Sequence, residues 1–360
     1  MTVKTSRRNG SKRASAGAAT IYDVAKKVGV SPMTVSRVVN GESNVREETR
    51  AAVQKAMREL QFRPNKAARS LAGATECRVG LLYNNPSVPY FTELLMGALE
   101  GSGRNGAQLV VDKCKIADLE AAAAAVRNLV KNGINGMVLT APISESMELI
   151  SELKDQGVAI VAVARSSYSG EVTCVGIDDY RAAYEMTKYL IGLGHRRIGF
   201  IRGHPNHTSS RQRLNGFEAA MRDAGDKVEK PRIAQGYYSY RSGMMAGEEL
   251  LSARQPPTAI FASNDDMASG VLSMAHRRGF DVPRDLSVAG FDDTTAGSQW
   301  PSLTTVRQPI FDIASIAIDV VLHNLRELHA GRQPETQNHL VPHLLVVRES
   351  AAPPRRLERV

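Results

Sequence analysis

Polar side chains stand at the ends of apolar segments in the second half of the chain. Asn264 directly follows AIFAS, Asp292 ends LSVAGFD, and Arg213 lies in the helical stretch that comes after RIGFIRG. An amide, a carboxylate and a guanidinium can each engage two neighbouring oxygen atoms, so these side chains suit the vicinal hydroxyls of a polar ligand. The competing interpretations are helix capping for Asn264 and Asp292 and a surface salt bridge for Arg213.

The segments around these residues predict the fold that must position them. From Cys77 onward, apolar strand-like segments alternate with amphipathic helical ones, which is typical of a doubly wound parallel sheet. The rhythm starts again after VTCVGID. We therefore expect two lobes, with crossovers near Asp179 and Gln308, a final helix from Ile310 to His329, and a final strand in HLLVVRES.

A cleft between the lobes is the expected ligand site, because ligands bind beyond the carboxyl ends of the strands in open parallel sheets. Strand-end residues of both lobes would meet there. Tyr90 and Phe91 could equally be core residues at the start of a helix, and Arg165 could point to solvent. The candidate ligand-binding residues are Tyr90, Phe91, Thr140, Arg165, Arg213, Tyr238, Asn264, Asp292 and Gln308.

No catalytic motif accompanies these residues. The chain contains no GxSxG elbow and no Walker loop, and GLGH at 192–195 precedes a strand instead of following one, unlike a dinucleotide-binding loop. His195, His204 and His207 lack a usable metal-ligand spacing to an acidic partner. We therefore expect a binding protein that is not an enzyme and that needs no metal or cofactor.

Near the N-terminus, the segment Ile21–Asn40 (IYDVAKKVGVSPMTVSRVVN) predicts two short helices separated by a tight turn. Ala25, Gly29 and Val35 occupy the places where a helix-turn-helix needs a small residue, a turn former and an apolar anchor. Gly29 accepts the left-handed conformation that ends a helix, and Ser31 can cap the second helix. An ordinary helical hairpin is the alternative.

The positive charge of the chain is concentrated around this motif. Residues 1–75 contain 15 Lys and Arg against 5 Asp and Glu, whereas the remaining residues contain 31 against 32. The surplus behind the net charge of +9 therefore resides on the quarter of the chain that carries the helix-turn-helix. A basic balance confined to one small domain indicates a polyanionic partner, most simply nucleic acid.

The remaining composition is that of a globular protein. Hydrophobic residues make up 42% and charged residues 23% of 360 residues, enough for two or three compact units. Cys77, Cys114 and Cys174 are isolated thiols, which argues against a disulfide framework and fits a reducing compartment. No apolar run is long enough to span a membrane, and no signal-peptide core follows the basic N-terminus. We expect a soluble cytoplasmic protein.

Residues 20–73 resemble the DNA-binding headpiece and hinge of the lac repressor family. The matching motifs are TIYDVAKKVGVS, TVSRVVNG and RPNKAARSLAG, and the two-lobed remainder, which resembles periplasmic sugar-binding proteins, also fits that family. The resemblance implies that the second helix enters the major groove and that paired hinge helices fold in the minor groove, where Leu71 wedges into a base step. It also implies effector contacts for Arg213, Asn264 and Asp292 and an aromatic platform at Tyr238.

The same resemblance gives the candidate DNA-binding residues. Pro32 and Met33 stand where some relatives carry an aromatic residue and an amide, so base discrimination there should depend on apolar contact. Arg37 is the best candidate for a guanine edge, while polar neighbours on its helix would position phosphates. The full set is Thr20, Tyr22, Ser31, Pro32, Met33, Thr34, Ser36, Arg37, Asn40, Asn65, Ala68 and Leu71.

These observations together predict the domain organisation. We expect a two-lobed effector-binding and dimerisation domain whose N-lobe comprises about 77–178 and 309–330 and whose C-lobe comprises about 179–308 and 331–350. The other predicted segments are a disordered basic arm at 1–19, a helix-turn-helix domain at 20–64, a hinge helix and linker at 65–76, and a disordered tail at 351–360.

The expected function is that of a sequence-specific transcriptional regulator, most simply a repressor of carbohydrate-utilisation genes. A homodimer would bind pseudo-palindromic double-stranded operator DNA, and a sugar or sugar derivative between the lobes would alter the hinge helices and operator binding. Two alternatives stay open. One is a purine- or other metabolite-responsive regulator of the same architecture, and the other is a cytoplasmic sugar-binding protein that does not bind DNA.

Overall fold

The computed structural model describes residues 19–39, 45–62, 77–83, 85–113, 119–164, 170–225 and 232–355. By its internal contacts, the chain divides into two units, residues 1–76 and residues 77–360. Most of the predicted basic arm, the hinge segment at 65–76 and the last five residues lie outside the described residues.

The first unit contains the predicted helix-turn-helix, followed by a third helix; its helices are α1 (Ile21–Val28), α2 (Pro32–Val39) and α3 (Glu47–Glu59). A reciprocal capping box begins α1: the Thr20 hydroxyl accepts from the Asp23 N–H at 3.3 Å, and the Asp23 carboxylate accepts from the Thr20 N–H at 2.8 Å. Gly29 ends α1 with a φ of 74°, and Ser31 Oγ accepts from the Thr34 N–H at 3.1 Å where α2 begins. The turn and cap chemistry expected from the sequence is confirmed.

A small apolar core holds these three helices together. Ala25 and Val35, the expected small residue and apolar anchor, are both buried in it. Because the same stripe of each helix faces this core, the opposite face of α2 stays available to a partner. The buried residues of this core are Val24, Ala25, Val35, Val38, Val53 and Ala56.

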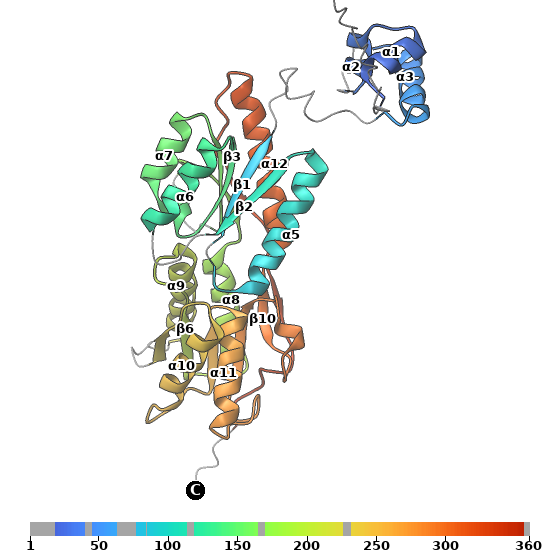
Figure 1. Ribbon diagram of the computed structural model, residues 1–360. Coiled ribbons are helices and arrows are strands. Elements are labelled where there is room, and N and C mark those ends of the chain that lie inside the picture. The colour runs from blue at the N-terminus through green and yellow to red at the C-terminus, as the bar shows by residue number, and fades with distance from the viewer. Residues whose placement is uncertain are drawn as a thin grey trace, which may run out of the picture. The chain divides into compact units, whose positions relative to one another are not determined.

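The second unit consists of two lobes, each built on a six-stranded sheet covered by helices (Figure 1). The N-lobe sheet has the strand order β11-β5-β4-β3-β1-β2, and every pairing in it is parallel. Its strands are β1 (Arg78–Tyr83), β2 (Gln108–Lys113), β3 (Gly136–Thr140), β4 (Ala159–Val163), β5 (Thr173–Gly176) and β11 (Asn338–Leu340). Its helices are α5 (Val88–Asn105), α6 (Leu119–Lys131), the 3-10 turn η1 (Ile143–Glu145), α7 (Met147–Asp155) and α12 (Ile310–His329).

The C-lobe repeats this architecture with the strand order β12-β10-β9-β8-β6-β7, and only the β10–β12 pairing is antiparallel. Its strands are β6 (Ile198–Arg202), β7 (Ile233–Gln235), β8 (Ala259–Ala262), β9 (Ser287–Asp292), β10 (Thr304–Arg307) and β12 (Leu344–Val346). Its helices are α8 (Asp179–Gly192), α9 (Thr208–Asp223), α10 (Tyr240–Leu251), α11 (Asp265–Arg277) and the 3-10 turn η3 (Ala296–Ser298).

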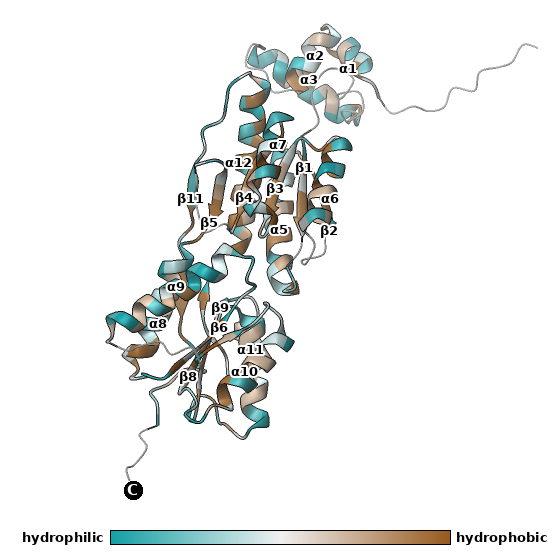
Figure 2. Cartoon of the chain, turned by 90° about the vertical axis from the view of Figure 1, so that its left-hand side faces the viewer, coloured by the Kyte–Doolittle hydropathy of each residue, from teal (hydrophilic) through white to brown (hydrophobic). Residues whose placement is uncertain are grey.

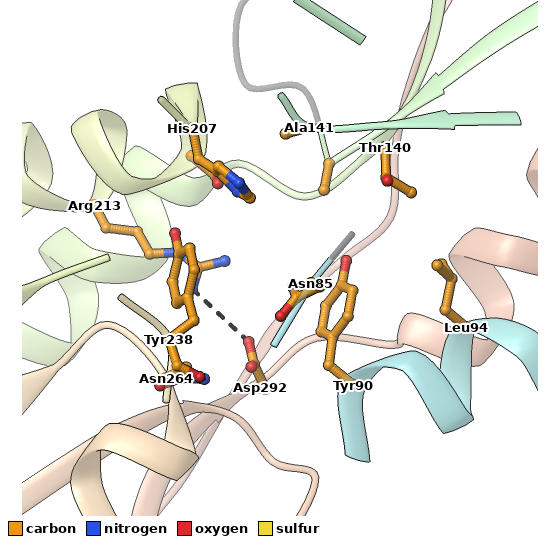
Figure 3. A pocket seen from close by; sticks show the side chains of 12 residues that line it. Asn85, Tyr90, Leu94, Thr140, Ala141, His207, Arg213, Tyr238, Asn264 and Asp292 are labelled. Atoms are coloured by element: carbon orange, nitrogen blue, oxygen red, sulfur yellow. Dashed lines mark hydrogen bonds and ion pairs between the residues drawn. The ribbon is translucent and has the colours of Figure 1, made fainter. Parts of the chain in front are cut away.

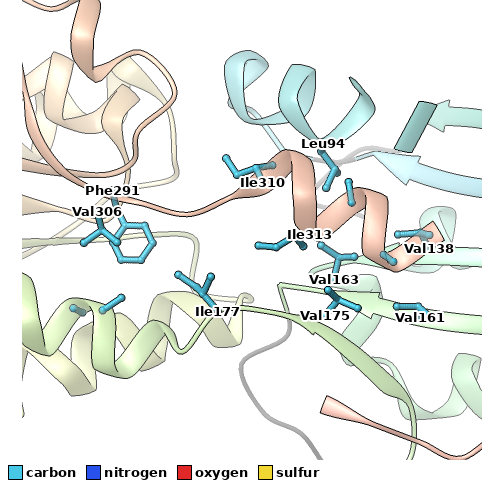
Figure 4. Close-up of a cluster of buried hydrophobic side chains, with 14 of the residues drawn as sticks. Leu94, Val138, Val161, Val163, Val175, Ile177, Phe291, Val306, Ile310 and Ile313 are labelled. Carbon is cyan, nitrogen blue, oxygen red and sulfur yellow. The ribbon is translucent and has the colours of Figure 1, made fainter. Parts of the chain in front are cut away.

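Continuous apolar strands form the centre of both lobes, as Figure 2 shows by their brown colour. Every residue of β4 (AIVAV) is buried, which is the pattern of a strand covered on both faces. Helix α12 lies against this sheet, and its residues Ile310 and Ile313 belong to the same buried apolar cluster as the valines of the central strands (Figure 4). Among the described residues, no helix is both long and apolar enough to cross a membrane.

Three connections link the lobes, and the third lies later in the chain than the predicted lobe boundary at 330/331. Two of them, between β5 and α8 and between β10 and α12, lie at the expected crossovers. The third joins β11 of the N-lobe to β12 of the C-lobe through residues 341–343. The assignment of 331–350 to the C-lobe was therefore wrong for its first part, because Asn338–Leu340 pairs with β5, whereas β12 does pair with β10 of the C-lobe. This edge strand has three residues and no buried alternation, so it gave no periodic signal.

The segment after Ser350 was expected to be disordered, and for residues 351–355 that expectation was wrong. The buried ring of His195 fixes this segment: its Nε2 donates to the Ala352 carbonyl at 2.9 Å, and its Nδ1 lies 2.9 Å from the Thr258 hydroxyl. The Ala352 N–H also donates to Ser287 Oγ at 3.0 Å. Strands β7 and β10 and helix α10 likewise had no counterpart in the sequence prediction.

Candidate functional site

A cleft lies between the lobes at the carboxyl ends of the strands (Figure 3). It encloses about 530 Å³ including its mouth. It is lined by Asn85, Tyr90, Leu94, Thr140, Ala141 and Ala164 from the N-lobe and by His207, Ser209, Arg213, Tyr238, Asn264 and Asp292 from the C-lobe.

Arg213 is the electrostatic centre of the cleft and is only 4% exposed. Its Nε donates to Asp179 Oδ1 at 2.7 Å, its Nη1 donates to the Ser263 carbonyl at 2.5 Å, and Nη1 lies 3.8 Å from Asp292 Oδ1. The guanidinium also stacks 3.6 Å from the centre of the Phe291 ring. Burial alone would lower the pKa of Arg213, but the two carboxylates carry it above its ordinary value. The competing interpretation of Arg213, a salt bridge at the surface, does not hold, because its ion pair with Asp179 is buried.

Asp292 ends β9 and points into the cleft with a left-handed φ of 107°. Gln308 Nε2 donates to its Oδ1 at 2.5 Å from the β10–α12 crossover, so Gln308 supports Asp292 from behind and is not one of the lining residues. Burial raises the pKa of Asp292 to about 7, against the opposing influence of Arg213 and Gln308. The carboxyl group can therefore accept or donate a hydrogen bond near neutral pH.

Asn264 caps a helix, as the competing interpretation expected, and it also lines the cleft. Its Oδ1 caps α11 by accepting from the Met267 N–H at 3.0 Å, while its Nδ2 donates to the Tyr238 carbonyl at 3.2 Å. The second bond supports Tyr238 in a left-handed conformation with a φ of 59°. Such a φ is unusual for a bulky residue, and here it turns the ring into the cleft. Gly203 leaves room for that ring, because a Cβ there would lie 2.2 Å from Tyr238 Cζ.

The remaining predicted residues divide into three groups. Tyr90 and Thr140 line the cleft, and Thr140 Oγ1 also donates to the Leu82 carbonyl at 3.2 Å. Phe91 is half-buried on α5 and does not line it. Arg165 lies outside the described residues. Trp300, the only tryptophan of the chain, does not line the cleft and is 89% exposed.

Sequence reasoning missed His207 and Ser209 as lining residues. Ser209 precedes Arg213 by four residues, and that spacing places both on one face of α9, so the signal was available. His207 was considered only as a metal ligand. Its ring is 7% exposed and lies 5.4 Å from the Tyr238 ring and 5.2 Å from the His204 ring. Burial lowers the pKa of His207 to about 3, with further contributions from His204 and Arg213, so the ring is neutral.

The neutral state of His207 predicts a pH-dependent stability. An unfolded histidine titrates near 6.5, so the unfolded chain binds the proton first, and stability is lost as the pH falls below 6.5 toward 3. Between pH 7.5 and 5.5 the wild type should lose about 1.4 kcal/mol more than His207→Gln. Urea unfolding at both pH values measures this difference. Parallel losses in both proteins would show that His207 is protonated at no cost when folded.

In the first unit, the predicted recognition face of α2 is exposed. Met33 is 63% and Tyr22 of α1 is 70% accessible, which is unusual for large apolar side chains and fits a surface that contacts a partner. Arg37 is exposed on the same helix, whereas the Thr34 and Ser31 hydroxyls are hydrogen-bonded to each other at 2.9 Å. Asn40, Asn65, Ala68 and Leu71 lie outside the described residues.

Comparison with known proteins decides the family. Residues 20–65 match the description "Bacterial regulatory proteins, lacI family", and residues 187–351 match "Periplasmic binding protein-like domain". A PurR transcriptional repressor of Haemophilus influenzae strain Rd is 31% identical over 333 residues, which cover 91% of this chain and 97% of that protein. The chain belongs to the lacI family of bacterial regulatory proteins. It is a DNA-binding transcriptional regulator and not an enzyme.

Two solved structures share the whole architecture. The lac repressor dimer bound to operator and the anti-inducer ONPF superposes with a TM-score of 0.75 at 27% identity, covering 93% of this chain and all of that one. The complex of the regulator CelR with cellobiose gives a TM-score of 0.68 at 27% identity over 92% of this chain and 99% of that one. The predicted headpiece and two-lobed α/β fold are confirmed.

Proposed function

We propose that this regulator represses carbohydrate-utilisation genes in the cytoplasm and that a sugar-like effector bound between its lobes controls operator binding. The observation that carries the proposal is the convergence of Arg213, Asn264 and Asp292 with the Tyr238 ring in one cleft. These side chains offer paired hydrogen-bonding atoms for vicinal hydroxyls and an apolar face for a sugar ring. CelR, a relative of the same architecture, binds cellobiose.

Two side chains of the cleft, Arg213 and Asp292, form bonds to residues at the two major crossovers. Effector binding in the cleft can therefore change the arrangement of the lobes. Asp179, the partner of Arg213, is the first residue of α8 just after the β5–α8 crossover. Gln308, the partner of Asp292, lies in the β10–α12 crossover. An effector that takes hydrogen bonds from Arg213 and Asp292 changes what each crossover is bonded to. It shifts the lobe equilibrium to the extent that it prefers one arrangement.

Contacts across the mouth of the cleft also depend on the lobe arrangement. Thr208 Oγ1 in the C-lobe donates to Glu145 Oε1 in the N-lobe at 2.5 Å. Ser87 of the N-lobe also forms a hydrogen bond with Asp266 on α11. Burial raises the pKa of Asp266, and this hydrogen bond lowers it by a smaller amount. Both bonds break when the lobes separate, so they favour the present closed arrangement over an open one.

A homodimer is the proposed assembly. Val88, Met96 and Leu99 form an exposed apolar stripe along α5, and Trp300 and Tyr240 expose large rings on the C-lobe. Contiguous apolar side chains at the surface of both lobes fit an isologous interface. Two headpieces related by such an axis would match a pseudo-palindromic operator, and the lac repressor binds its operator as a dimer.

A purine effector is the second candidate. Tyr90 and Tyr238 line the cleft from opposite lobes, and two aromatic rings facing one site can hold a planar base between them. PurR, the relative from Haemophilus influenzae, is a repressor of similar length. Thermal-shift screening of mono- and disaccharides against nucleobases separates the two candidates. We expect stabilisation by a sugar, and stabilisation by nucleobases alone would contradict the sugar proposal.

Arg37→Ala tests the recognition helix. A guanidinium that binds a guanine edge contributes about 1–3 kcal/mol of discrimination, so operator affinity should fall roughly ten- to a hundredfold and preference at one base pair should relax. Lys27→Ala is the matched control, because Lys27 is ion-paired with Glu59 at 2.7 Å within the headpiece. Fluorescence anisotropy with operator variants measures both effects. A uniform loss across all sequences would make Arg37 a phosphate contact instead.

A further inference from the structure

The positive charges of the cleft are already neutralised. Arg213 is the only cationic side chain among the described residues that line it, because His207 is neutral. Asp179 lies 2.7 Å and Asp292 lies 3.8 Å from its guanidinium. An anionic ligand would therefore meet one cation flanked by two buried carboxyl groups. The local charge favours a ligand without a negative charge.

The other positive feature of the cleft region, the N-terminus of α9, is also occupied. The residue at its cap position is His207, which makes no side-chain capping hydrogen bond. The carboxylate of Glu145 from the opposite lobe lies at this end of the helix, where it accepts from the side-chain hydroxyl of Thr208, the first residue of α9, at 2.5 Å. A carboxylate at this end complements the helix dipole and repels a second anion.

The cleft itself offers neutral groups that can form hydrogen bonds, the Tyr238 hydroxyl and the His207 ring. The Tyr238 hydroxyl is buried on a residue that is 5% exposed and makes no hydrogen bond of normal geometry, although the nearby Ser209 side chain lowers its pKa against the larger effect of burial. In Figure 3, Tyr238 and His207 both point into the cleft, from different loops. Burying a hydroxyl that has no hydrogen-bond partner is unfavourable, so a ligand group that forms a hydrogen bond with it removes this penalty and binds more tightly.

We infer that His207 is a specificity-determining residue, which together with Tyr238 takes an uncharged hydroxyl group of the effector and, with Glu145 behind it, excludes phosphate and carboxylate groups. This inference depends on the proposed function, because it specifies the class of sugar that the cleft accepts. The accepted sugars are unphosphorylated and carry no acid group. Recognition at the other end of the cleft, at Arg213, Asn264 and Asp292, is common to both classes.

The test uses the full chain and ligand pairs that differ only by a phosphate group: glucose with glucose 6-phosphate, ribose with ribose 5-phosphate, and inosine with inosine monophosphate. Calorimetric titration gives the affinity ratio within each pair that binds. A like charge in a partly buried site changes affinity by roughly tenfold or more, so the uncharged member should bind at least about tenfold more tightly. A phosphorylated member that binds equally or more tightly overturns the inference.

Two variants locate the selectivity. Glu145→Gln keeps the hydrogen bond from Thr208 but removes the charge, and it should reduce the preference for the uncharged ligand several-fold; His207→Arg should reduce it further. Glu148→Gln, the same change at an exposed position of α7, is the control and should leave the ratio unchanged. Unchanged ratios in both test variants would overturn the role of this end of the cleft. Binding confined to the inosine pair would contradict the sugar proposal, while the affinity ratio within that pair still tests the inference.

Discussion

Arg213→Ala is expected to abolish effector binding and to destabilise the two-lobed unit by about 3–5 kcal/mol, the usual cost of removing one partner from a buried ion pair. Arg213 pairs with the buried Asp179, and it also donates to the Ser263 carbonyl and stacks on Phe291. Without it, the buried carboxylate of Asp179 loses the guanidinium that lies 2.7 Å away. Urea unfolding and calorimetric titration of the screened effector measure the two losses.

A second variant keeps this prediction testable if the alanine protein does not fold. Arg213→Lys retains the charge but loses the planar fork that reaches two acceptors, so it should fold and bind the effector at least tenfold more weakly. Arg181→Ala is the control, because Arg181 forms an exposed pair with Glu185 at 2.8 Å, and exposed pairs contribute at most about 1 kcal/mol. Wild-type stability and effector affinity in Arg213→Ala would contradict the central role of this residue.

Leu71→Ala is expected to weaken operator binding by about a hundredfold while leaving effector affinity unchanged. The expectation comes from the resemblance of RPNKAARSLAG to the family hinge, since Leu71 lies outside the described residues. Inserting an apolar side chain between base pairs costs a few kcal/mol of base stacking, and the additional contacts that the bent DNA makes with the protein offset this cost. An alanine side chain is too short to be inserted in this way. Gel-shift titration measures the loss, Leu71→Met is the control that retains a wedge, and an unchanged operator affinity would refute the role.

The sequence predicted the cleft where its residues follow a rule of topology. Asn264 and Asp292 end neighbouring strands of one parallel sheet, so their convergence follows from the strand order. Helix-turn-helix residues such as Gly29 and Val35 were equally predictable, because Gly29 only has to adopt a left-handed conformation and Val35 only has to fill the core. In both cases a local pattern determines a position without knowledge of distant contacts.

The sequence could not predict features that depend on contacts between distant segments. Strand β11 forms by pairing with the edge of β5. The segment around Ala352 is held by a hydrogen bond to His195, which lies 157 residues earlier in the chain. His207 owes its neutral state to burial beside Tyr238 and Arg213, which no spacing in the sequence reveals. The placement of Gln308 behind Asp292, instead of in the cleft, likewise depends on the geometry of the crossover.

The central claim, that effector binding in the cleft controls DNA binding by the headpiece, is tested most directly by one titration. The full chain is titrated with a duplex selected from a random pool and with its scrambled counterpart, at two salt concentrations, with and without the sugar found by thermal shift. We expect affinity that falls steeply with salt, a preference of about a thousandfold or more for the selected duplex, and an effector-induced change of roughly 5- to 150-fold that Arg213→Lys diminishes. Equal affinity for both duplexes, or an operator affinity that bound sugar leaves unchanged, would contradict it.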